Sequence, residues 1–222
     1  MGKVYKLISK FADALAELLF PSHTVCMLCG REARVDEDMM CDRCALMLSE
    51  SAAYNDILEK SEHIDDMRIF VSYRKSMHHA ITAMKYNSAT YMPQYLAGFM
   101  KPDDNWQVDI ITCVPLHRRK ERMRGYNQTA LMAMEVARRE KIPFEPQALK
   151  KIRYTRSQAK LNRSERLISP YGSYSADENI CKGKSILLID DVCTTGATVE
   201  ECARMLKGSG AEKVYVMALA HG

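Results

Sequence analysis

The sequence predicts an α/β protein in which a parallel sheet is flanked by helices, with a small cysteine-rich module on the N-terminal side. Short β-branched apolar runs bounded by polar residues, such as residues 186–189, predict the sheet, because buried parallel strands have this pattern. A small-residue loop, a stretch at helical spacing (198–207) and another strand pattern (213–220) follow, and together they form a strand–loop–helix–strand unit. A chain of 222 residues is long enough for one such domain and an appendage.

The first part of the chain has apolar residues at helical spacing, which predict an amphipathic helix over residues 4–20. Acidic and lysine side chains are mixed on its polar side. This mixture favours docking on the chain's own domain over binding at a membrane surface. Because no apolar run approaches the length of a membrane span and no signal-peptide layout is present, we expect a cytoplasmic protein.

Two Cys-x-x-Cys pairs follow, at residues 26–29 and 41–44. Each pair can place two thiolates on one tetrahedral ion, and the intervening loop is long enough to bring the pairs together. Redox pairs or free thiols are the alternative, but they make no use of the paired spacing. We therefore predict a structural zinc without an open position for catalysis. Its ligands are Cys26, Cys29, Cys41 and Cys44.

We assign residues 1–50 to this module and residues 51–222 to the sheet domain. A polar helical linker is predicted over residues 45–67, and alternation predicts a strand over residues 68–73. Lys85, close to a predicted turn, is interpreted as a solvated side chain rather than one that faces a ligand. The same periodicities predict helices over residues 76–86, 91–100 and 127–141, a strand over 109–114 and one short strand within 169–174.

The loop after residues 186–189 has the chemistry of a sugar-phosphate site. Its small residues offer successive backbone N–H groups and hydroxyls at a helix N-terminus, which suits a monophosphate. Asp190 and Asp191 accept hydrogen bonds when ionised, so they fit the two vicinal hydroxyls of a ribose, with Mg²⁺ completing the neutralisation. A chance acidic strand end before a capped helix is the alternative. The phosphate-binding residues are Thr194, Thr195, Gly196, Ala197 and Thr198.

This stretch resembles the phosphoribosyl pyrophosphate loop of type I phosphoribosyltransferases, whose pyrophosphate leaving group needs neighbouring cations. A basic stretch that follows the predicted strand 109–114 supplies them, since a proline fixes a sharp turn and a run of cations then overhangs the sheet edge. Residues 115–166 hold fifteen Lys or Arg and five Asp or Glu, in a chain of net charge +4. A solvated basic face is the alternative, but the surplus brackets a predicted polyanion site. The predicted pyrophosphate loop contains Pro115, Leu116, Arg118 and Arg124.

Residues 153–166 lack a clean period and resemble a mobile lid whose cations close over a ligand. The predicted lid residues are Arg153, Arg156, Gln158 and Arg166.

Four motifs follow one another along the chain: the four-cysteine knuckle, Val-Pro-Leu with Arg-Gly-Tyr-Asn-Gln within residues 114–128, Gln-Ala-Lys-Leu-Asn-Arg-Ser-Glu-Arg at 158–166, and Ile-Asp-Asp-Val-Cys-Thr-Thr-Gly-Ala-Thr at 189–198. In this order they are similar to the ComF family, which consists of phosphoribosyltransferase-like proteins associated with bacterial competence and DNA uptake. After Arg166 the chain departs from the usual family pattern, because Leu-Ile-Ser-Pro stands in place of Arg-x-x-Asn.

The resemblance implies a type I phosphoribosyltransferase-like fold, phosphoribosyl pyrophosphate with Mg²⁺ as ligand, and a structural zinc. As partners it implies single-stranded DNA and a competence helicase or recombination proteins. Two function classes stay open on the sequence. The chain is either a competence component that binds the ligand and single-stranded DNA, which the basic surplus favours, or an active phosphoribosyltransferase that uses a nitrogen acceptor. The acceptor does not follow from the sequence, because no base-recognition pocket is evident.

Overall fold

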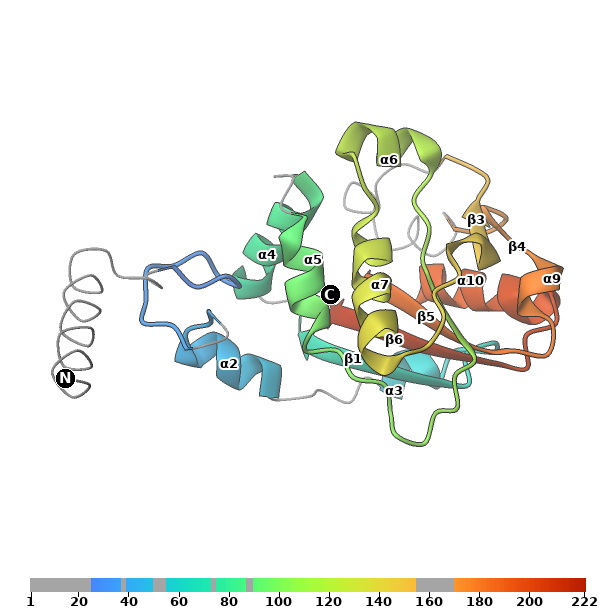
Figure 1. The fold of residues 1–222 in the computed structure, drawn as a ribbon, viewed down its shortest axis with the longest axis horizontal. Helices are drawn as coiled ribbons and strands as arrows, with labels where there is room; N and C mark the ends of the chain where they lie inside the picture. Colours follow the sequence, from blue (N-terminus) through green and yellow to red (C-terminus); the bar gives the residue numbers. More distant parts are fainter. Residues whose placement is uncertain (1–24, 37–38, 50–54, 73–74, 87–89, 155–169) are drawn as a thin grey trace, which may run out of the picture.

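The structure is a computed structural model of the chain and describes residues 25–36, 39–49, 55–72, 75–86, 90–154 and 170–222. Its centre is a four-stranded sheet in which every neighbouring pair of strands is parallel (Figure 1). The fold class predicted from the sequence is therefore confirmed. In spatial order the strands are β1 (Asp66–Ser72), β6 (Lys213–His221), β5 (Ser185–Cys193) and β2 (Ile110–Cys113).

Helices cover both faces of this sheet. Successive side chains of each strand point to opposite faces, so a fully apolar strand presents apolar side chains to helices on both sides. On one face Leu187 and Ile189 of β5 pack into a cluster with side chains of α4 (Lys75–Tyr86), α5 (Tyr91–Ala97) and α7 (Gln128–Glu140). On the other face Ile186 and Leu188 pack against α10 (Ala197–Gly208). The long apolar runs of β5 and β6 are thus buried on both sides, as the sequence pattern predicts.

Smaller elements complete the second face and the edges. A two-stranded antiparallel sheet of β3 and β4 lies beside the α10 layer, and β4 has its own contacts with α10. The remaining elements are β3 (Leu149–Lys151), β4 (Tyr174–Ala176), α2 (Asp42–Ser49), α3 (Asn55–Leu58), α6 (Arg118–Arg124), α9 (Glu178–Cys181) and the short 3₁₀ helix η1 (Pro146–Ala148).

Two predictions about local structure are wrong. The helical linker expected over residues 45–67 is interrupted, because Asp65 exchanges backbone and side-chain hydrogen bonds with Val214 and so begins the pairing with β6. The cationic loop after β2 contains a helix, α6, which starts at a capping His117 and ends where Gly125 adopts φ 88°. Its sequence consists of good helix formers but buries no residue, so it has no apolar period to reveal it.

The helix predicted over residues 4–20 lies outside the described residues. Within the part of the chain that the structure does describe, no helix has the length and apolar character needed to cross a bilayer.

Candidate functional site

The two acids lie inside the last part of β5 rather than after it. Because β6 runs on beside β5, the backbone pairing continues from Asp190 opposite Ala218 to Cys193 opposite His221. Alternation along the strand places the two carboxylates on opposite faces, with Asp190 toward α10 and Asp191 toward α7. Both are buried, with 6% and 5% of their surface exposed. A ligand at the strand end therefore meets one acid on each side of β5.

Residues 194–196 join β5 to α10, so the predicted phosphate-binding residues 194–198 comprise this loop and the first two residues of α10. Gly196 has φ 79° and packs so closely on Ile57 of α3 that a Cβ would lie 2.5 Å from its Cγ2 atom. The N-cap residue of α10, Gly196, has no side chain to accept a hydrogen bond, and the first N–H groups of a helix have no partner within it. The helix N-terminus is therefore suited to an anion, which the helix dipole also favours.

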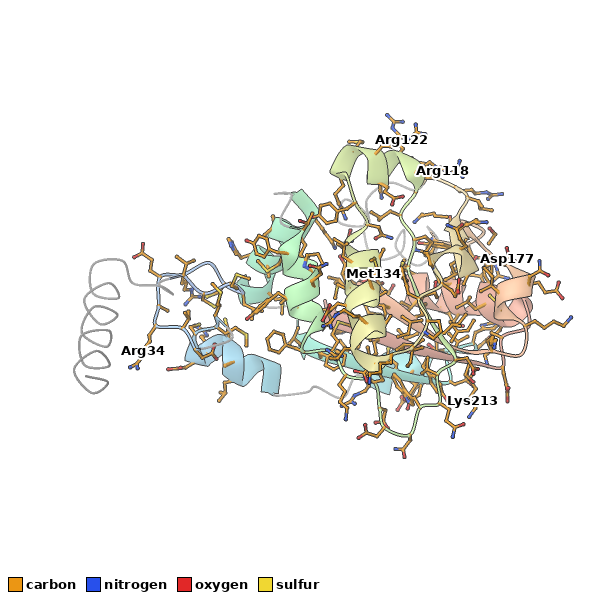
Figure 2. The ribbon with its side chains drawn as sticks, in the orientation of Figure 1. Arg34, Arg118, Arg122, Met134, Asp177 and Lys213 are labelled. Carbon is orange, nitrogen blue, oxygen red and sulfur yellow. The ribbon has the colours of Figure 1, made fainter. Side chains whose placement is uncertain are left out.

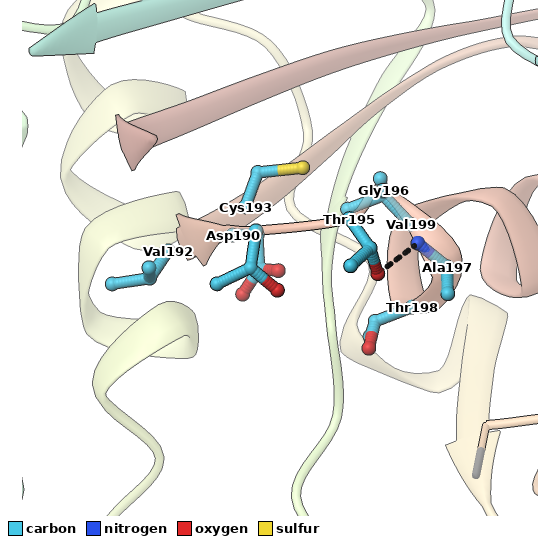
Figure 3. Close-up of a pocket in the computed structure, with 9 residues that line it drawn as sticks. Asp190, Val192, Cys193, Thr195, Gly196, Ala197, Thr198 and Val199 are labelled. Atoms are coloured by element: carbon cyan, nitrogen blue, oxygen red, sulfur yellow. Dashed lines mark hydrogen bonds between the residues drawn. The ribbon is translucent and has the colours of Figure 1, made fainter. Parts of the chain in front are cut away.

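One small pocket joins this loop to an acid. Figure 3 shows Asp190 on the same hollow as the start of α10, where Thr195 accepts a hydrogen bond from the Ala197 N–H at 3.4 Å. The structure thus brings together the predicted phosphate loop and one of the two predicted diol-binding acids. The pocket is lined by Asp190, Val192, Cys193, Thr194, Thr195, Gly196, Ala197, Thr198 and Val199.

Lys85 is part of this site, and its interpretation as a solvated side chain is wrong. Its Nζ atom lies 2.7 Å from Oδ2 of Asp191, and only 23% of the lysine side chain is exposed. Burial alone would lower the pKa of Lys85, but the Asp191 carboxylate outweighs this effect and raises it. A lysine at the end of an amphipathic helix carries no sequence signal for such a pairing, because the contact is with a strand about a hundred residues later.

The two carboxyl groups have opposite electrostatic surroundings. Burial, reinforced by the charge of Asp191, raises the pKa of Asp190 to about 8. Burial acts on Asp191 in the same direction, but the Lys85 ammonium and the Gln128 amide outweigh it and lower the pKa of Asp191. Asp191 is therefore the more readily ionised member of the pair, whereas burial favours the protonated form of Asp190.

The Arg-Gly-Tyr-Asn-Gln motif forms the other side of the site, and each of its residues has a contact or a backbone conformation that explains its presence. Gly125 ends α6 with positive φ, and Asn127 caps α7 by accepting from the Thr129 N–H at 3.2 Å. The Tyr126 hydroxyl donates to the backbone carbonyl of Met84, next to Lys85. Gln128 is the first residue of α7 and donates from Nε2 to Oδ2 of Asp191 at 2.9 Å, while its Oε1 accepts from Arg124.

The loop after β2 leads into an exposed basic surface. Pro115 and Leu116 are half-buried between β2 and α6, and Arg124 turns inward to Gln128. Arg118 and Arg122 lie at the outer edge of the molecule (Figure 2). The predicted pyrophosphate loop is therefore split, since Arg124 belongs to the buried network and Arg118 to the outer surface.

Two lysines that are not among the predicted site residues also face this region. Burial, together with the charges of Arg124 and Lys85, lowers the pKa of Lys120. Burial and the charge of Lys120 lower the pKa of Lys151 to about 8, and its Nζ lies 2.8 Å from the Tyr174 hydroxyl. The pattern of β3 gives no hint of this role, because the strand has only three residues.

Of the predicted lid, the structure describes only the start. Arg153 donates its backbone N–H to Ser173 at 3.3 Å, and its guanidinium lies along Gly172. Tyr154 has 47% of its surface exposed, beside Arg119 and Lys120. The other lid residues, Arg156, Gln158 and Arg166, lie outside the described residues.

The four N-terminal cysteines converge as predicted. Their sulfur atoms all lie within 4.8 Å of one another, and those of Cys29 and Cys41 are 4.0 Å apart. Four sulfurs bound to one zinc at about 2.3 Å lie about 3.8 Å from each other, so the cluster fits a tetrahedral ion. The Cys41 N–H points at the Cys26 sulfur at 3.4 Å, a contact that favours the thiolate form. Cys26 and Cys44 are buried in the same cluster as Met77 of α4, so the knuckle packs on the sheet domain.

The chain is similar to several known proteins. The phosphoribosyl transferase domain family matches residues 128–222. Competence protein F of Haemophilus influenzae is 31% identical over 114 residues, half of this chain and half of that protein. Competence protein ComFC of Bacillus subtilis is 26% identical over 94% of this chain and 92% of that protein, and DNA utilization protein YhgH of Escherichia coli K12 is 25% identical over 88% and 89%. Among solved structures, the glutamine phosphoribosylpyrophosphate amidotransferase of B. subtilis has a TM-score of 0.42 and 20% identity over 63% of this chain and 30% of that chain.

Proposed function

We propose that the chain is a member of the ComF family of phosphoribosyltransferase-like proteins, that it binds phosphoribosyl pyrophosphate with Mg²⁺ and that it acts in DNA uptake. One observation carries the ligand assignment. Asp190 and the loop of residues 194–198 line a single pocket at the N-terminus of α10, and Asp191 lies on the opposite face of β5. A phosphate cradle with two adjacent carboxylates matches a ribose 5-phosphate better than a nucleotide triphosphate, because no Gly-Lys-Ser/Thr sequence is present.

The proposal gives each part of the site one role. The N–H groups and hydroxyls of residues 194–198 would hold the 5-phosphate. Asp190 and Asp191 would accept from the ribose hydroxyls, and Mg²⁺ bound with the ligand would neutralise part of its charge. Arg124, Lys85 and Lys120, which influence one another electrostatically, would face the pyrophosphate.

Calorimetric titration with phosphoribosyl pyrophosphate in Mg²⁺ buffer tests this assignment. We expect saturable binding by the wild type and its loss in the double variant Asp190→Asn, Asp191→Asn. The matched control is Asp103→Asn with Asp104→Asn, an adjacent pair of acids outside the site. Unchanged affinity in the first double variant would show that these acids hold something else. Pyrophosphate release in the presence of candidate nucleobases then distinguishes an active phosphoribosyltransferase from a protein that only binds the ligand.

The DNA part of the proposal is supported by the outer surface of α6. Arg118 and Arg119 are exposed there, and the exposed Tyr154 ring lies 5.4 Å from the Arg119 guanidinium. Cations beside an accessible aromatic ring are typical of surfaces that bind single-stranded nucleic acid, because the cations contact phosphates and the ring stacks on a base. The names of the curated relatives, which mention competence and DNA utilization, agree with this role.

Affinity for a single-stranded oligonucleotide, measured at several salt concentrations, tests this part. Each phosphate contact contributes roughly 0.7 to the log–log salt slope, so Ala at Arg118, Arg119 and Lys120 should flatten it by up to about two units. The control triple variant, with Ala at Lys182, Lys184 and Lys213, removes three exposed lysines from the opposite end of the strands. Parallel slopes for wild type and the α6 variant would show that these three cations contact no DNA backbone.

A further inference from the structure

We propose that the Gln128 side chain couples the two halves of the ligand site, so that occupation of the pyrophosphate half changes the affinity of the ribose half. This inference rests on the proposed function and concerns how the site works as a unit. Arg124 belongs to the cationic half, and Asp191 belongs to the half that would accept the ribose hydroxyls. One side chain, that of Gln128, contacts both.

The contacts form a continuous chain across four segments. Arg124, the last residue of α6, donates to Oε1 of Gln128 at the start of α7. Nε2 of Gln128 donates to Oδ2 of Asp191 on β5 at 2.9 Å, and the same oxygen accepts from Nζ of Lys85 on α4 at 2.7 Å. Gln128 is 4% exposed and Asp191 5%. Because both side chains are buried, water does not compete freely for these hydrogen bonds.

A carboxamide is the side chain that this position requires. Its oxygen can only accept and its nitrogen can only donate, so it joins a cation on one side to an anion on the other. The neighbours therefore fix its orientation, since the reverse would place the amide nitrogen against the guanidinium and the oxygen against the carboxylate. A glutamate would keep the contact with Arg124 and repel Asp191. A methionine of similar length would keep the packing and lose both hydrogen bonds.

Binding of an anion changes this network in a definite direction. A pyrophosphate at Arg124 and Lys85 competes with Gln128 and Asp191 for the positive charge of these two residues. The Gln128 amide is then less polarised, and the ion pair between Lys85 and the Asp191 carboxylate becomes weaker. Asp191 becomes a better acceptor for a ribose hydroxyl, so we expect each half of the ligand to strengthen the binding of the other.

The network is buried, but its removal should leave the fold in place. Without the Gln128 amide, Asp191 keeps the Lys85 ammonium at 2.7 Å, so no isolated charge is left in the interior. The start of α7 keeps its cap, because Asn127 accepts from the Thr129 N–H and Thr129 donates its hydroxyl to the Val114 carbonyl at 2.7 Å. Gln128→Met therefore isolates the coupling from the stability of the helix.

The test uses the two halves of the ligand as separate probes. Pyrophosphate is titrated calorimetrically into the zinc-loaded full chain in Mg²⁺ buffer, without and with saturating ribose 5-phosphate. The ratio of the two dissociation constants is the coupling factor, and the reciprocal titration must return the same factor. We expect a factor of about ten for the wild type and below about three for Gln128→Met. The control Gln94→Met, at an exposed glutamine of α5, should keep the wild-type factor.

The outcomes separate the inference from the proposed function. Equal coupling factors in wild type and Gln128→Met, or no coupling in the wild type although both probes bind, would overturn the inference and leave the proposed site standing. Absence of binding by both probes in the wild type would overturn both. If Gln128→Met loses its melting transition, Gln128→Glu replaces it, because this variant keeps the acceptor for Arg124. It should also lose the coupling, and retention of the full factor would contradict the role of the amide.

Discussion

Substitution of Lys85 by Met removes the ammonium group that neutralises a buried carboxylate, and we expect it to destabilise the fold by about 3 kcal/mol. At the observed separation of 2.7 Å, an effective dielectric constant of about 20 gives an attraction of about 6 kcal/mol, part of which offsets the desolvation of the two charges. Removing one partner of a buried pair typically costs about 3–5 kcal/mol. The lower end applies here, because Lys85 is 23% exposed and Gln128 still donates to Asp191.

Urea denaturation of the zinc-loaded protein measures this loss, and an exposed ion pair supplies the control. Lys101 and Asp104 are also 2.7 Å apart, but 64% and 83% of their side chains are exposed. Because water screens such a pair, Lys101→Met should cause no comparable loss. The contrast between two pairs of equal length isolates the effect of burial.

The pH dependence gives a second measurement with a definite sign. Asp191 has a lowered pKa in the folded chain, so its ionised form adds stability above the pKa of the unfolded carboxyl group, and this stability is lost on acidification. The penalty of Lys85→Met should accordingly be largest at neutral pH and shrink toward pH ~4. Adding Asp191→Asn to Lys85→Met should recover most of the loss, because no uncompensated charge then remains. A neutral-pH loss below about 0.5 kcal/mol, or a double variant no more stable than Lys85→Met, would refute this account of the pair.

Three further predictions concern other parts of the chain. Purified protein should contain one equivalent of zinc, and Cys44→Ser should lose the metal and melt at a lower temperature. Metal analysis and thermal melts check this. If metal-free protein melts at the same temperature, the prediction of a structural zinc is wrong. Asp190→Asn should stabilise the fold increasingly as the pH rises from about 4 to about 8, because the raised pKa makes ionisation of the buried wild-type carboxyl unfavourable. Urea denaturation at both pH values measures the free energy of unfolding. An equal gain of the variant over the wild type at both pH values would contradict the prediction. Gly196→Ala should weaken phosphoribosyl pyrophosphate binding, because the added Cβ would lie 2.5 Å from Ile57 and the backbone has a φ of 79°, so the loop has to move. Unchanged affinity, measured by calorimetry, would show that the loop tolerates the added Cβ.

The sequence predicted the sheet well because its signals are local. Residues 186–189 and 213–220 lie inside β5 and β6, and polar residues bound both apolar runs. The convergence of the four cysteines was predictable for a similar reason, since the spacing within each cysteine pair already places two sulfurs together. Features that depend on one local period or one short motif were therefore found from the sequence alone.

The contacts that connect distant segments were not predictable in this way. Lys85 was interpreted as solvated because its partner Asp191 lies on another element, and only the tertiary fold brings the two side chains together. The Arg-Gly-Tyr-Asn-Gln motif was recognised as a unit, but the sequence did not show that Gln128 reaches Asp191 or that Tyr126 donates to Met84. A motif indicates that its residues act together, whereas their roles depend on what the fold places opposite them.

The charge balance of the site follows from these distant contacts. Asp191 is already paired with Lys85, and burial raises the pKa of Asp190 and so disfavours its ionised form. Among the described residues, no carboxylate within ion-pair distance neutralises Lys120 or Lys151, although burial lowers the pKa of both lysines. The site is thus short of negative charge on the side of α6 and β3. An anionic ligand would supply that charge, and the same deficit explains why a neutral sugar alone should bind far more weakly than its phosphorylated form.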